Sequence, residues 1–279
     1  MFKNVHGVGL RPTHYNEILK TSPDIGWFEV IAENYMDTYG KPRRVLESVR
    51  ENYPIAMHGV SLSIGSTDTF SKEYLDRWKL LIDQIDPFLI SDHLCWTHIK
   101  NHNSHDLLPL PFTREAAKHI IERIDFVQTF LKRDISIENI SSYVVFRHSE
   151  MTEWEFIAFI AKQSGCKILL DINNIFVNSV NFNFDPMTYL NNVPKHLVSQ
   201  IHLAGHTDMG TFLFDTHDCH VAPKVWDLYA IAVDRFGSIP TLIEWDDQIP
   251  SLEVLLKESK KAKFIMKTRL TPRSHALAS

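Results

Sequence analysis

The sequence predicts one α/β domain built as a (β/α)8 TIM barrel. Eight short apolar runs recur along the chain, and segments with helical periodicity separate them. The runs are apolar throughout rather than alternating, which is typical of parallel strands that are covered by helices. The length of 279 residues also fits one barrel, since single α/β barrels commonly reach about 250 residues.

The N-terminal half contains five of the apolar runs. We expect strands at 8–11, 27–33, 55–60, 88–96 and 134–140. Amphipathic segments predict helices at 43–51, 72–85 and 113–131. The last of these helices begins with Thr113, a favoured N-cap residue, and has Glu115 in its first turn, where the helix dipole favours an acid.

The C-terminal half repeats the alternation. We expect strands at 167–174, 198–204 and 241–245, and helices at 152–163, 223–236 and 251–261. Thr152 is a candidate N-cap, and Gly165 and Gly237 each follow a predicted helix as a stop. No linker or internal repeat marks a boundary, so residues 1–269 are expected to form the barrel and 270–279 a loosely ordered tail. An open doubly wound sheet is the rival fold, but no glycine-rich phosphate turn follows the first strand.

The composition excludes several classes of protein. The formal net charge is −5, which argues against a general nucleic-acid binder. No apolar run approaches the roughly 18 residues that a membrane span needs, and the N-terminus lacks a signal-peptide core. We therefore expect a cytoplasmic protein without a membrane partner. Three widely spaced cysteines without a CxxC pair argue against a disulfide framework or a thiolate zinc site.

Polar and ionisable residues stand at the end of strand after strand. Barrel active sites lie at the C-terminal ends of the strands, so we expect these side chains to meet. The candidates are His58, Asp92, His93, Glu138, Asn139, Asp171, Asn173, Asn174, His202, His206, Asp215, His217 and Glu244. The densest stretch, 215–220, holds two aspartates and two histidines.

Four carboxylates of this set are expected to point into one cavity: Glu138, Asp171, Asp215 and Glu244. Their mutual repulsion and desolvation would drive some of them to protonate, whereas divalent cations would remove the problem directly. The histidines among them supply neutral nitrogen ligands. The pattern therefore predicts a polynuclear metal site, against the alternative of a solvated polar loop with incidental histidines.

Several motifs together resemble one known family, the multinuclear non-heme iron-dependent oxidases, which include the oxidase of methanobactin biosynthesis. The motifs are HGVSLSIGS at 58–66, SDHLCW at 91–96, ENISSY at 138–143, LLDINNI at 169–175, QIHLAGH at 200–206, DTHD at 215–218 and LIEWD at 242–246. The resemblance implies a xylose-isomerase-like TIM barrel that holds two or three irons. It also implies oxygen-dependent modification of cysteine in a ribosomally made precursor peptide, with a partner protein that presents the peptide.

The chain is more distantly similar to endonuclease IV, a trinuclear zinc barrel. The ligand order of that enzyme falls on His58, His93, Glu138, Asp171, Asn174, His202, Asp215, His217 and Glu244. Asn174 departs from the nuclease pattern, which has a histidine there. An amide oxygen is a weaker donor, so one position is expected to be more labile or suited to iron with an open position. Zinc and manganese stay open as alternatives, because ligand type alone does not fix the metal.

Two further residues are candidates for catalysis. Asp246 lies two residues after Glu244 and could transfer protons, although a hydrogen bond to a loop would also explain it. His206 could contact the substrate or support a metal ligand. The His- and Pro-rich segment 101–111 is expected to be a loop over the barrel mouth.

The leading hypothesis is therefore an iron-dependent oxidase that acts on a cysteine-containing precursor peptide. One alternative is a metal-dependent phosphodiesterase of the endonuclease IV type, against which the acidic balance and Asn174 both argue. Another is a non-catalytic, metal-dependent peptide-binding protein. Sugar isomerisation is a further minor alternative.

Overall fold

Eight parallel strands close into a barrel in the computed structural model, which describes residues 5–100 and 102–271. The strands are β1 (His6–Gly9), β2 (Trp27–Ile31), β3 (Ile55–His58), β4 (Leu89–His93), β7 (Ser136–Glu138), β8 (Lys167–Asp171), β9 (Val198–Leu203) and β12 (Thr241–Ile243). They follow one another round the barrel in chain order, and β12 pairs with β1 to close it. The predicted TIM barrel is confirmed.

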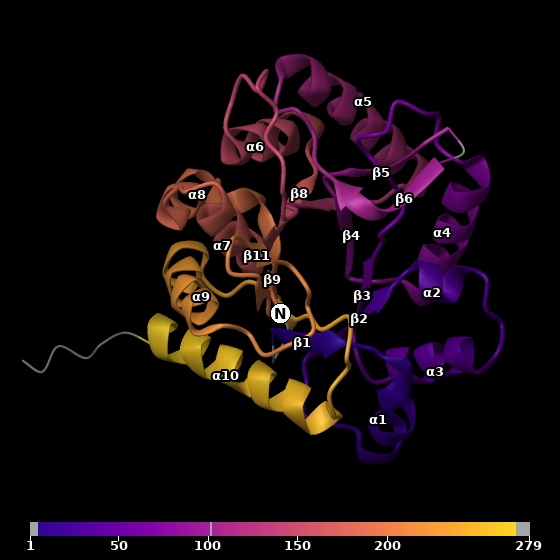
Figure 1. The fold of residues 1–279 in the computed structure, drawn as a ribbon. Coiled ribbons are helices and arrows are strands. Elements are labelled where there is room, and N and C mark those ends of the chain that lie inside the picture. The colour runs from indigo at the N-terminus through magenta and orange to yellow at the C-terminus, as the bar shows by residue number, and fades with distance from the viewer. Residues whose placement is uncertain (1–4, 101, 272–279) are drawn as a thin grey trace, which may run out of the picture.

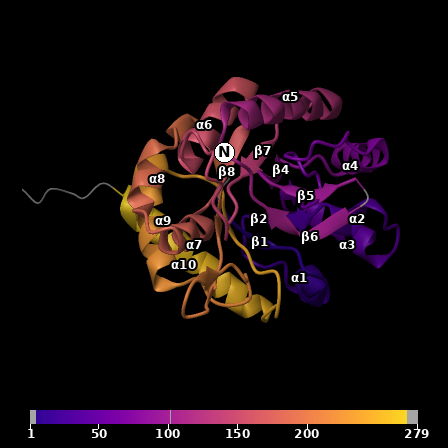
Figure 2. The same cartoon turned by 45° about the horizontal axis from the view of Figure 1, so that its top comes forward.

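Helices form a ring outside the strands (Figures 1 and 2). They are α1 (Tyr15–Thr21), α2 (Glu33–Met36), α3 (Lys41–Arg50), α4 (Lys72–Ile85), α5 (Arg114–Leu131), α6 (Glu153–Ser164), α7 (Ile172–Asn181), α8 (Pro186–Asn192), α9 (Pro223–Phe236) and α10 (Leu252–Leu270), with short 3-10 turns at Pro12–His14 and Lys195–Leu197. None of the helices in the described part of the chain is long and apolar enough to cross a membrane.

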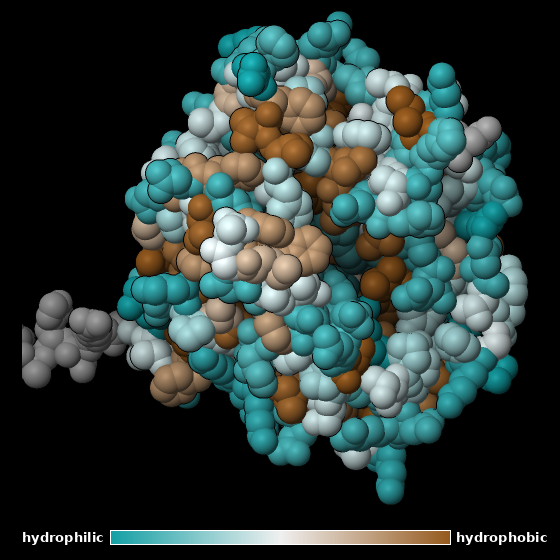
Figure 3. All heavy atoms as spheres, in the orientation of Figure 1, coloured by the Kyte–Doolittle hydropathy of each residue, from teal (hydrophilic) through white to brown (hydrophobic). Residues whose placement is uncertain are grey.

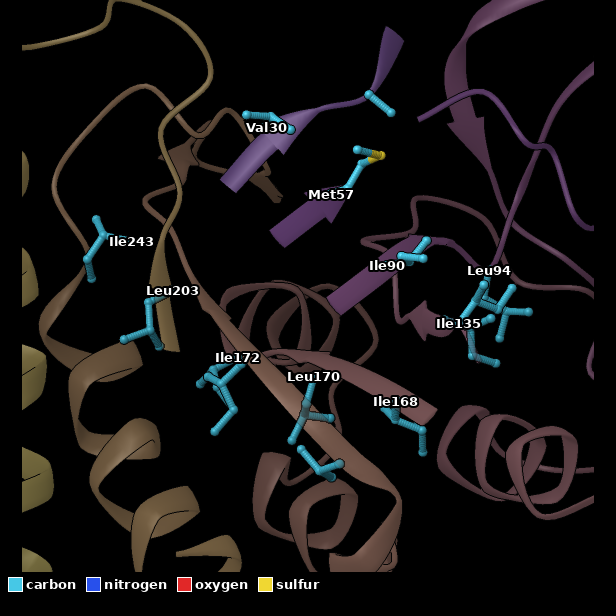
Figure 4. Packing of buried hydrophobic residues seen from close by; sticks show 14 of the residues in the cluster. Val30, Met57, Ile90, Leu94, Ile135, Ile168, Leu170, Ile172, Leu203 and Ile243 are labelled. Atoms are coloured by element: carbon cyan, nitrogen blue, oxygen red, sulfur yellow. The ribbon is translucent and has the colours of Figure 1, made fainter. Parts of the chain in front are cut away.

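Side chains alternate between the helical layer and the barrel lumen. Every second residue packs outward into one large apolar cluster, as Val30, Met57, Ile90, Leu170 and Leu203 do (Figure 4). The residues between them point inward, because successive side chains of a strand face opposite sides. The outward layer accounts for the apolar character of the runs that predicted the barrel.

An apolar plug fills the bottom of the lumen. Trp27, Ala56 and Leu242 form a separate buried cluster, with Phe88 and Leu89 against it. A Cβ atom at Gly7 would lie 2.5 Å from the Trp27 ring, so glycine is needed where the indole crosses β1. Two residues beyond Trp27, Ala56 and Leu242, the inward positions are polar and hold Glu29, His58 and Glu244.

The predicted N-caps are confirmed for two helices. Thr113 Oγ1 accepts a hydrogen bond from the backbone N–H of Ala116 at 3.1 Å. Thr152 and Glu155 form a capping box at the start of α6, and Gly165 ends that helix with φ of +73°. Helices α4 and α9 begin and end where the sequence predicts.

Several predicted boundaries are wrong. The predicted strand 167–174 ends at Asp171, because the Asp171 carboxylate accepts the Asn174 backbone N–H and begins α7. The predicted loop 101–111 contains β6 (His102–Leu108), which pairs antiparallel with β5 (Trp96–Ile99). Helix α10 runs on to Leu270, well past the predicted end at 261. Of the predicted tail 270–279, residues 272–279 lie outside the described residues.

Four helices and a second, smaller hairpin were also not predicted. The helices α1, α2 and α8 have seven residues or fewer, while α7 begins within the apolar run that predicts the strand 167–174. The hairpin pairs β10 (Thr207–Asp208) with β11 (Leu213–Phe214) and projects from the loop that follows β9.

Candidate metal centre

The inward positions of the strand ends bring histidines and carboxylates together in the lumen. Each follows another inward-facing residue by two positions, either within a strand or directly after its last residue. They are Glu29, His58, His93, Glu138, Asp171, His202 and Glu244, and all of them are buried. The strand alternation therefore directs both metal-ligand types into one cavity.

The first group consists of His58, His93 and Glu138, whose ligand atoms lie within 4.8 Å of one another. The two Nε2 atoms are 3.3 Å apart, and they lie 3.4 Å and 3.5 Å from Glu138 Oε2. The other nitrogen of His58, Nδ1, is 2.8 Å from Ser91 Oγ, which orients the ring. Two nitrogens and one carboxylate oxygen could therefore hold one cation.

The second group consists of Glu138, Asp171, His202 and Glu244. His202 Nδ1 lies 3.0 Å from Glu244 Oε2 and 3.6 Å from Glu138 Oε1. Glu138 thus belongs to both groups and presents one oxygen toward each. A carboxylate shared in this way is suited to bridge two cations.

The third group lies toward the barrel mouth and consists of His217, Glu244 and Asp246. His217 Nδ1 is 3.3 Å from Glu244 Oε2 and 3.1 Å from Asp246 Oδ2. On the other side of the ring, Nε2 is 2.7 Å from Asp215 Oδ1. Glu244 joins this group to the second one, so the three groups form one continuous row.

The loop that carries His217 is held tightly against the barrel. His217 has φ of +48°, and its backbone N–H donates to Gly205 O at 3.1 Å. Its own carbonyl accepts the Asp246 N–H at 2.8 Å. A Cβ atom at Gly205 would lie 2.4 Å from Cys219 O, so only glycine admits this approach. A left-handed non-glycine residue of this kind costs free energy and persists where the surroundings fix it, often at functional sites.

Burial governs the titration of these groups in the chain without cations. It raises the pKa of Glu138, and it raises the pKa of Asp171 well above its usual value, with added repulsion from Glu138. Burial opposes ionisation of Glu244 as well, but His202 and His217 outweigh it and hold the Glu244 pKa well below its usual value. Burial also lowers the pKa of His58, with repulsion from His93. Without cations, these buried carboxyl and imidazole groups share protons among themselves, and bound cations would replace those protons.

Buried oxygens without hydrogen bonds support the fit to metal ions. Glu138 Oε2, Asp171 Oδ2 and Asn174 Oδ1 find no hydrogen-bond partner among the described residues. Leaving such atoms buried and unpaired is costly, and their occurrence on two members of the second group and on Asn174, which bonds to Asp171, calls for an explanation. Cations coordinated by these oxygens would satisfy all three.

The structure brings the predicted ligands into the three groups or next to them. Asn174 donates its amide to Asn139 O at 3.0 Å, and the Asp171 side chain caps the same helix turn. Asp215 adjoins the third group through His217. Asp246, predicted for catalysis, belongs to that group itself.

His206, the second candidate for catalysis, contacts none of the three groups directly. Its Nδ1 is 2.7 Å from Asn173 Oδ1, and the Asn173 amide donates to Asp215 Oδ1 at 2.7 Å. Burial lowers the pKa of His206. His206 is therefore linked to Asp215, a predicted ligand, through the amide side chain of Asn173.

Asp92 is a strand-end candidate that does not join the groups. It faces outward on β4, where it accepts hydrogen bonds from the Leu62 and His93 backbone N–H groups at 3.1 Å and 2.7 Å. A Cβ atom at Gly59 would lie 2.4 Å from its Oδ2. Asp92 therefore organises the loop after β3.

Sequence reasoning missed two residues that contact the centre. Glu29 Oε1 lies 3.1 Å from His202 Nε2, and Arg11 pairs with Asp246 and donates to Trp245 O at 3.1 Å. The signal for Glu29 was present, because it is an acid in the middle of the apolar run 27–31. Arg11 offers no comparable signal, since it is a lone cation after β1.

Solved structures with the same fold include sugar epimerases. A D-tagatose 3-epimerase-like protein superposes with a TM-score of 0.60 at 14% identity, covering 97% of each chain. A D-psicose 3-epimerase determined in the presence of D-fructose gives 0.55 at 12%, also covering 97% of each chain. A xylose isomerase-like TIM barrel protein from Mycobacterium smegmatis, in complex with magnesium, gives 0.57 at 10% and covers 92% of this chain and 89% of the other. At such identities the likeness establishes the fold alone.

Relatives that are much more similar in sequence carry the name UPF0276 protein. One from Anaeromyxobacter sp. (strain Fw109-5) is 52% identical over 257 residues, covering 92% of this chain and 91% of its own length. One from Caulobacter vibrioides is 49% identical over 253 residues and covers 90% of each. One from Acaryochloris marina is 48% identical over 256 residues and covers 92% of each.

The family model described as "RiPP precursor modification enzyme MbnB/TglH/ChrH" matches residues 5–267. That match spans all eight strands and all three ligand groups. Its description indicates an enzyme that acts on precursor peptides, in agreement with the leading hypothesis at that coarser level. The chain therefore belongs to the MbnB/TglH/ChrH family of RiPP precursor modification enzymes.

Proposed function

We propose that the protein is a multinuclear iron-dependent oxidase that uses oxygen to modify cysteine residues of a ribosomally made peptide. The observation that carries the proposal is the row of three ligand groups, which share Glu138 and Glu244. Shared carboxylates fit two or three adjacent cations better than isolated ones. Family membership supplies the peptide as the substrate class.

The donor set suits iron. Imidazole nitrogens and carboxylate oxygens dominate all three groups, and none of them contains a cysteine. Such mixed ligands with open positions are typical of ferrous sites that react with oxygen. Iron held there would supply electrons for oxygen reduction and an acceptor for a substrate thiolate. Zinc or manganese would fit the same donors and are distinguished by experiment.

The residues at the mouth would handle the substrate and its protons. Asp246 is part exposed, lies beside His217 and is oriented by Arg11. We assign to Asp246 the acceptance of the proton from the incoming cysteine thiol, so that Asp215, His217 and Glu244 would hold the outer cation. His206, half-buried and held by Asn173, would orient the peptide beside Asp215.

The proposal also covers the partners and the location. A cysteine-containing precursor peptide would be the substrate, and a second protein would present it at the barrel mouth. We place the reaction in the cytoplasm, where such a precursor is made.

An oxygen-dependent assay tests the function. Anaerobically purified protein, loaded with ferrous iron or with zinc, is given cysteine-containing precursor peptides with and without oxygen. Iron-loaded protein should change the peptide mass only with oxygen, and the change should vanish when the substrate cysteine becomes serine. The phosphodiesterase alternative predicts instead that zinc-loaded protein cleaves an abasic-site duplex without oxygen. That cleavage, together with unchanged peptides, would refute the oxidase.

A further inference from the structure

An apolar groove of about 260 Å³ lies outside the ligand groups, beside the start of α6. Its walls include Phe112, Val144, Phe146, Trp154 and Phe184. Val144 is 56% exposed and its neighbour Val145 69%, which is high for adjacent valines. Figure 3 shows apolar side chains gathered on this part of the surface, near α6. An exposed apolar patch of this kind often marks a binding site.

A single acid, Glu153, lines the groove. Its Oε1 accepts a hydrogen bond from Tyr189 Oη and its Oε2 one from Asn178 Nδ2, both at 3.1 Å. Both donors are neutral, and no Lys, Arg or His of the described chain forms an ion pair with Glu153. Burial raises the pKa of Glu153 to about 7. The groove thus contains a poorly solvated carboxyl that lacks a counter-ion.

The loop that lines the groove also contacts Asp215, which adjoins the third ligand group. Ser142 lines the groove, and its neighbours reach Asp215: Ser141 Oγ donates to Asp215 Oδ2, and Tyr143 Oη accepts the Asp215 N–H, both at 3.0 Å. Asp215 Oδ1 in turn lies 2.7 Å from His217 Nε2. A peptide whose cysteine enters the barrel mouth beside Asp215 would therefore have a neighbouring residue close to the groove.

We propose that the groove binds a lysine or arginine side chain of the peptide substrate, with Glu153 as its counter-ion. The proposal rests on the proposed function for the identity of its ligand as a peptide. The aliphatic stem of such a side chain would pack on the apolar walls while its cationic head meets the carboxylate. Trp154 and Phe184, whose ring centroids are 5.5 Å apart, add aromatic faces that attract cations.

The charge decides between this ligand and a purely apolar one. An apolar side chain would bury the Glu153 carboxyl without giving it a counter-ion, so the acid would have to take up a proton or stay charged at a cost in free energy. An anionic ligand would add repulsion. A cation on an apolar stem matches both the walls and the acid of the groove.

Binding of a fixed probe tests the proposal without any turnover. The probe is a fluorescein-labelled acetyl-Leu-Lys-Phe peptide on a glycine linker, and its partner replaces Lys with norleucine. Fluorescence anisotropy with the metal-loaded protein should show binding that is roughly ten-fold or more weaker for norleucine, as for loss of a desolvated charge pair. Glu153→Gln should weaken binding of the Lys peptide by a similar factor.

Glu155→Gln is the matched control, because Glu155 is exposed in the same helical turn and glutamine keeps the capping box. It should leave binding unchanged. Equal binding of the two peptides, or undiminished binding to folded Glu153→Gln, would overturn the proposal. If Glu153→Gln does not fold, the wild-type protein is crosslinked to a probe that carries a photoreactive diazirine. Crosslinks outside residues 109–112, 142–154 and 182–184 would overturn the proposal.

The outcome is separable from the proposed oxidase activity. If the protein discriminates Lys from norleucine but never oxidises cysteine, the proposed role of the groove stands and the proposed oxidase function fails. If the protein oxidises cysteine but shows no preference for the cationic peptide, the proposed oxidase function stands and the proposed role of the groove fails.

Discussion

Glu29 holds His202 from below, with Oε1 3.1 Å from Nε2, while the opposite ring nitrogen faces the second ligand group. Glu29 Oε2 in turn accepts a hydrogen bond from Gln200 Nε2 at 2.6 Å. A carboxylate behind a ligating histidine fixes the ring orientation and its tautomer, and it makes the other nitrogen a better donor. Glu29 is thus a positioning residue for the candidate metal centre.

Glu29→Gln should weaken metal binding by roughly 10- to 100-fold, the usual effect of removing such a partner. The side chain keeps its size, so the barrel should fold. Competition with a chelator measures the affinity, and Glu17→Gln, an exposed acid on α1, is the control. Unchanged affinity in the Glu29 variant would show that His202 needs no carboxylate behind it.

Glu138→Gln should lose more metal than His93→Gln. Glu138 belongs to two ligand groups, whereas His93 belongs to one. Elemental analysis of both variants, each checked for folding by circular dichroism, gives the comparison. Full occupancy and normal turnover in Glu138→Gln would contradict the shared carboxylate. Equal loss in the two variants would contradict the bridging role.

Gly205→Ala should destabilise the loop that carries His217. The added Cβ would lie 2.4 Å from Cys219 O, so the backbone must shift, at a cost of about 1–3 kcal/mol. Metal should be lost from the third group before the others. Gly40→Ala is the control, since a Cβ there meets nothing closer than 4.0 Å, and its cost should stay within about 1 kcal/mol. Denaturant unfolding with parallel metal analysis measures both effects, and equal stability of the two variants would refute the tight approach at Gly205.

His6 should make the protein less stable in acid. Burial, with a smaller contribution from Lys263, lowers the pKa of His6 to about 4. The unfolded chain takes up this proton near the ordinary histidine pKa of about 6.5, so it binds more protons than the folded chain between the two values. The stabilisation is therefore complete above about pH 6.5 and declines as the pH falls toward 4, by up to about 3 kcal/mol.

His6→Gln should remove that part of the pH dependence. The free energy of unfolding of metal-free protein, measured by denaturant at pH 7.5 and pH 4.5, provides the comparison. His196→Gln, an exposed histidine, should keep the wild-type slope. A wild-type slope in His6→Gln would show that the histidine does not titrate as the structure implies.

The barrel was predictable because each strand is covered by helices and therefore reads as an apolar run. The candidate ligands were predictable as residue types at strand ends, where alternation sends every second side chain inward. The start of α7 was not, because Ile172 continues an apolar run and the Asp171 cap that ends the strand is a local hydrogen bond. The hairpin of β5 and β6 was also missed, since its polar outer strand has the composition of a loop.

The connections within the site depend on closure of the barrel. Glu138 and Glu244 lie on strands far apart in the chain, and their sharing between groups follows from their positions round the lumen. Glu29 stands within an apolar run of the sequence, although strand alternation places it on the same face as Trp27. The pairing of Arg11 with Asp246 arises because β1 and β12 are neighbours.

Metal stoichiometry tests the central claim most directly. The protein is expressed with ample iron, purified without oxygen and analysed for all first-row metals. The three joined ligand groups predict at least two metal ions per chain, mainly iron. One ion or none per chain would contradict the multinuclear centre, and stoichiometric zinc without iron would contradict the oxidase.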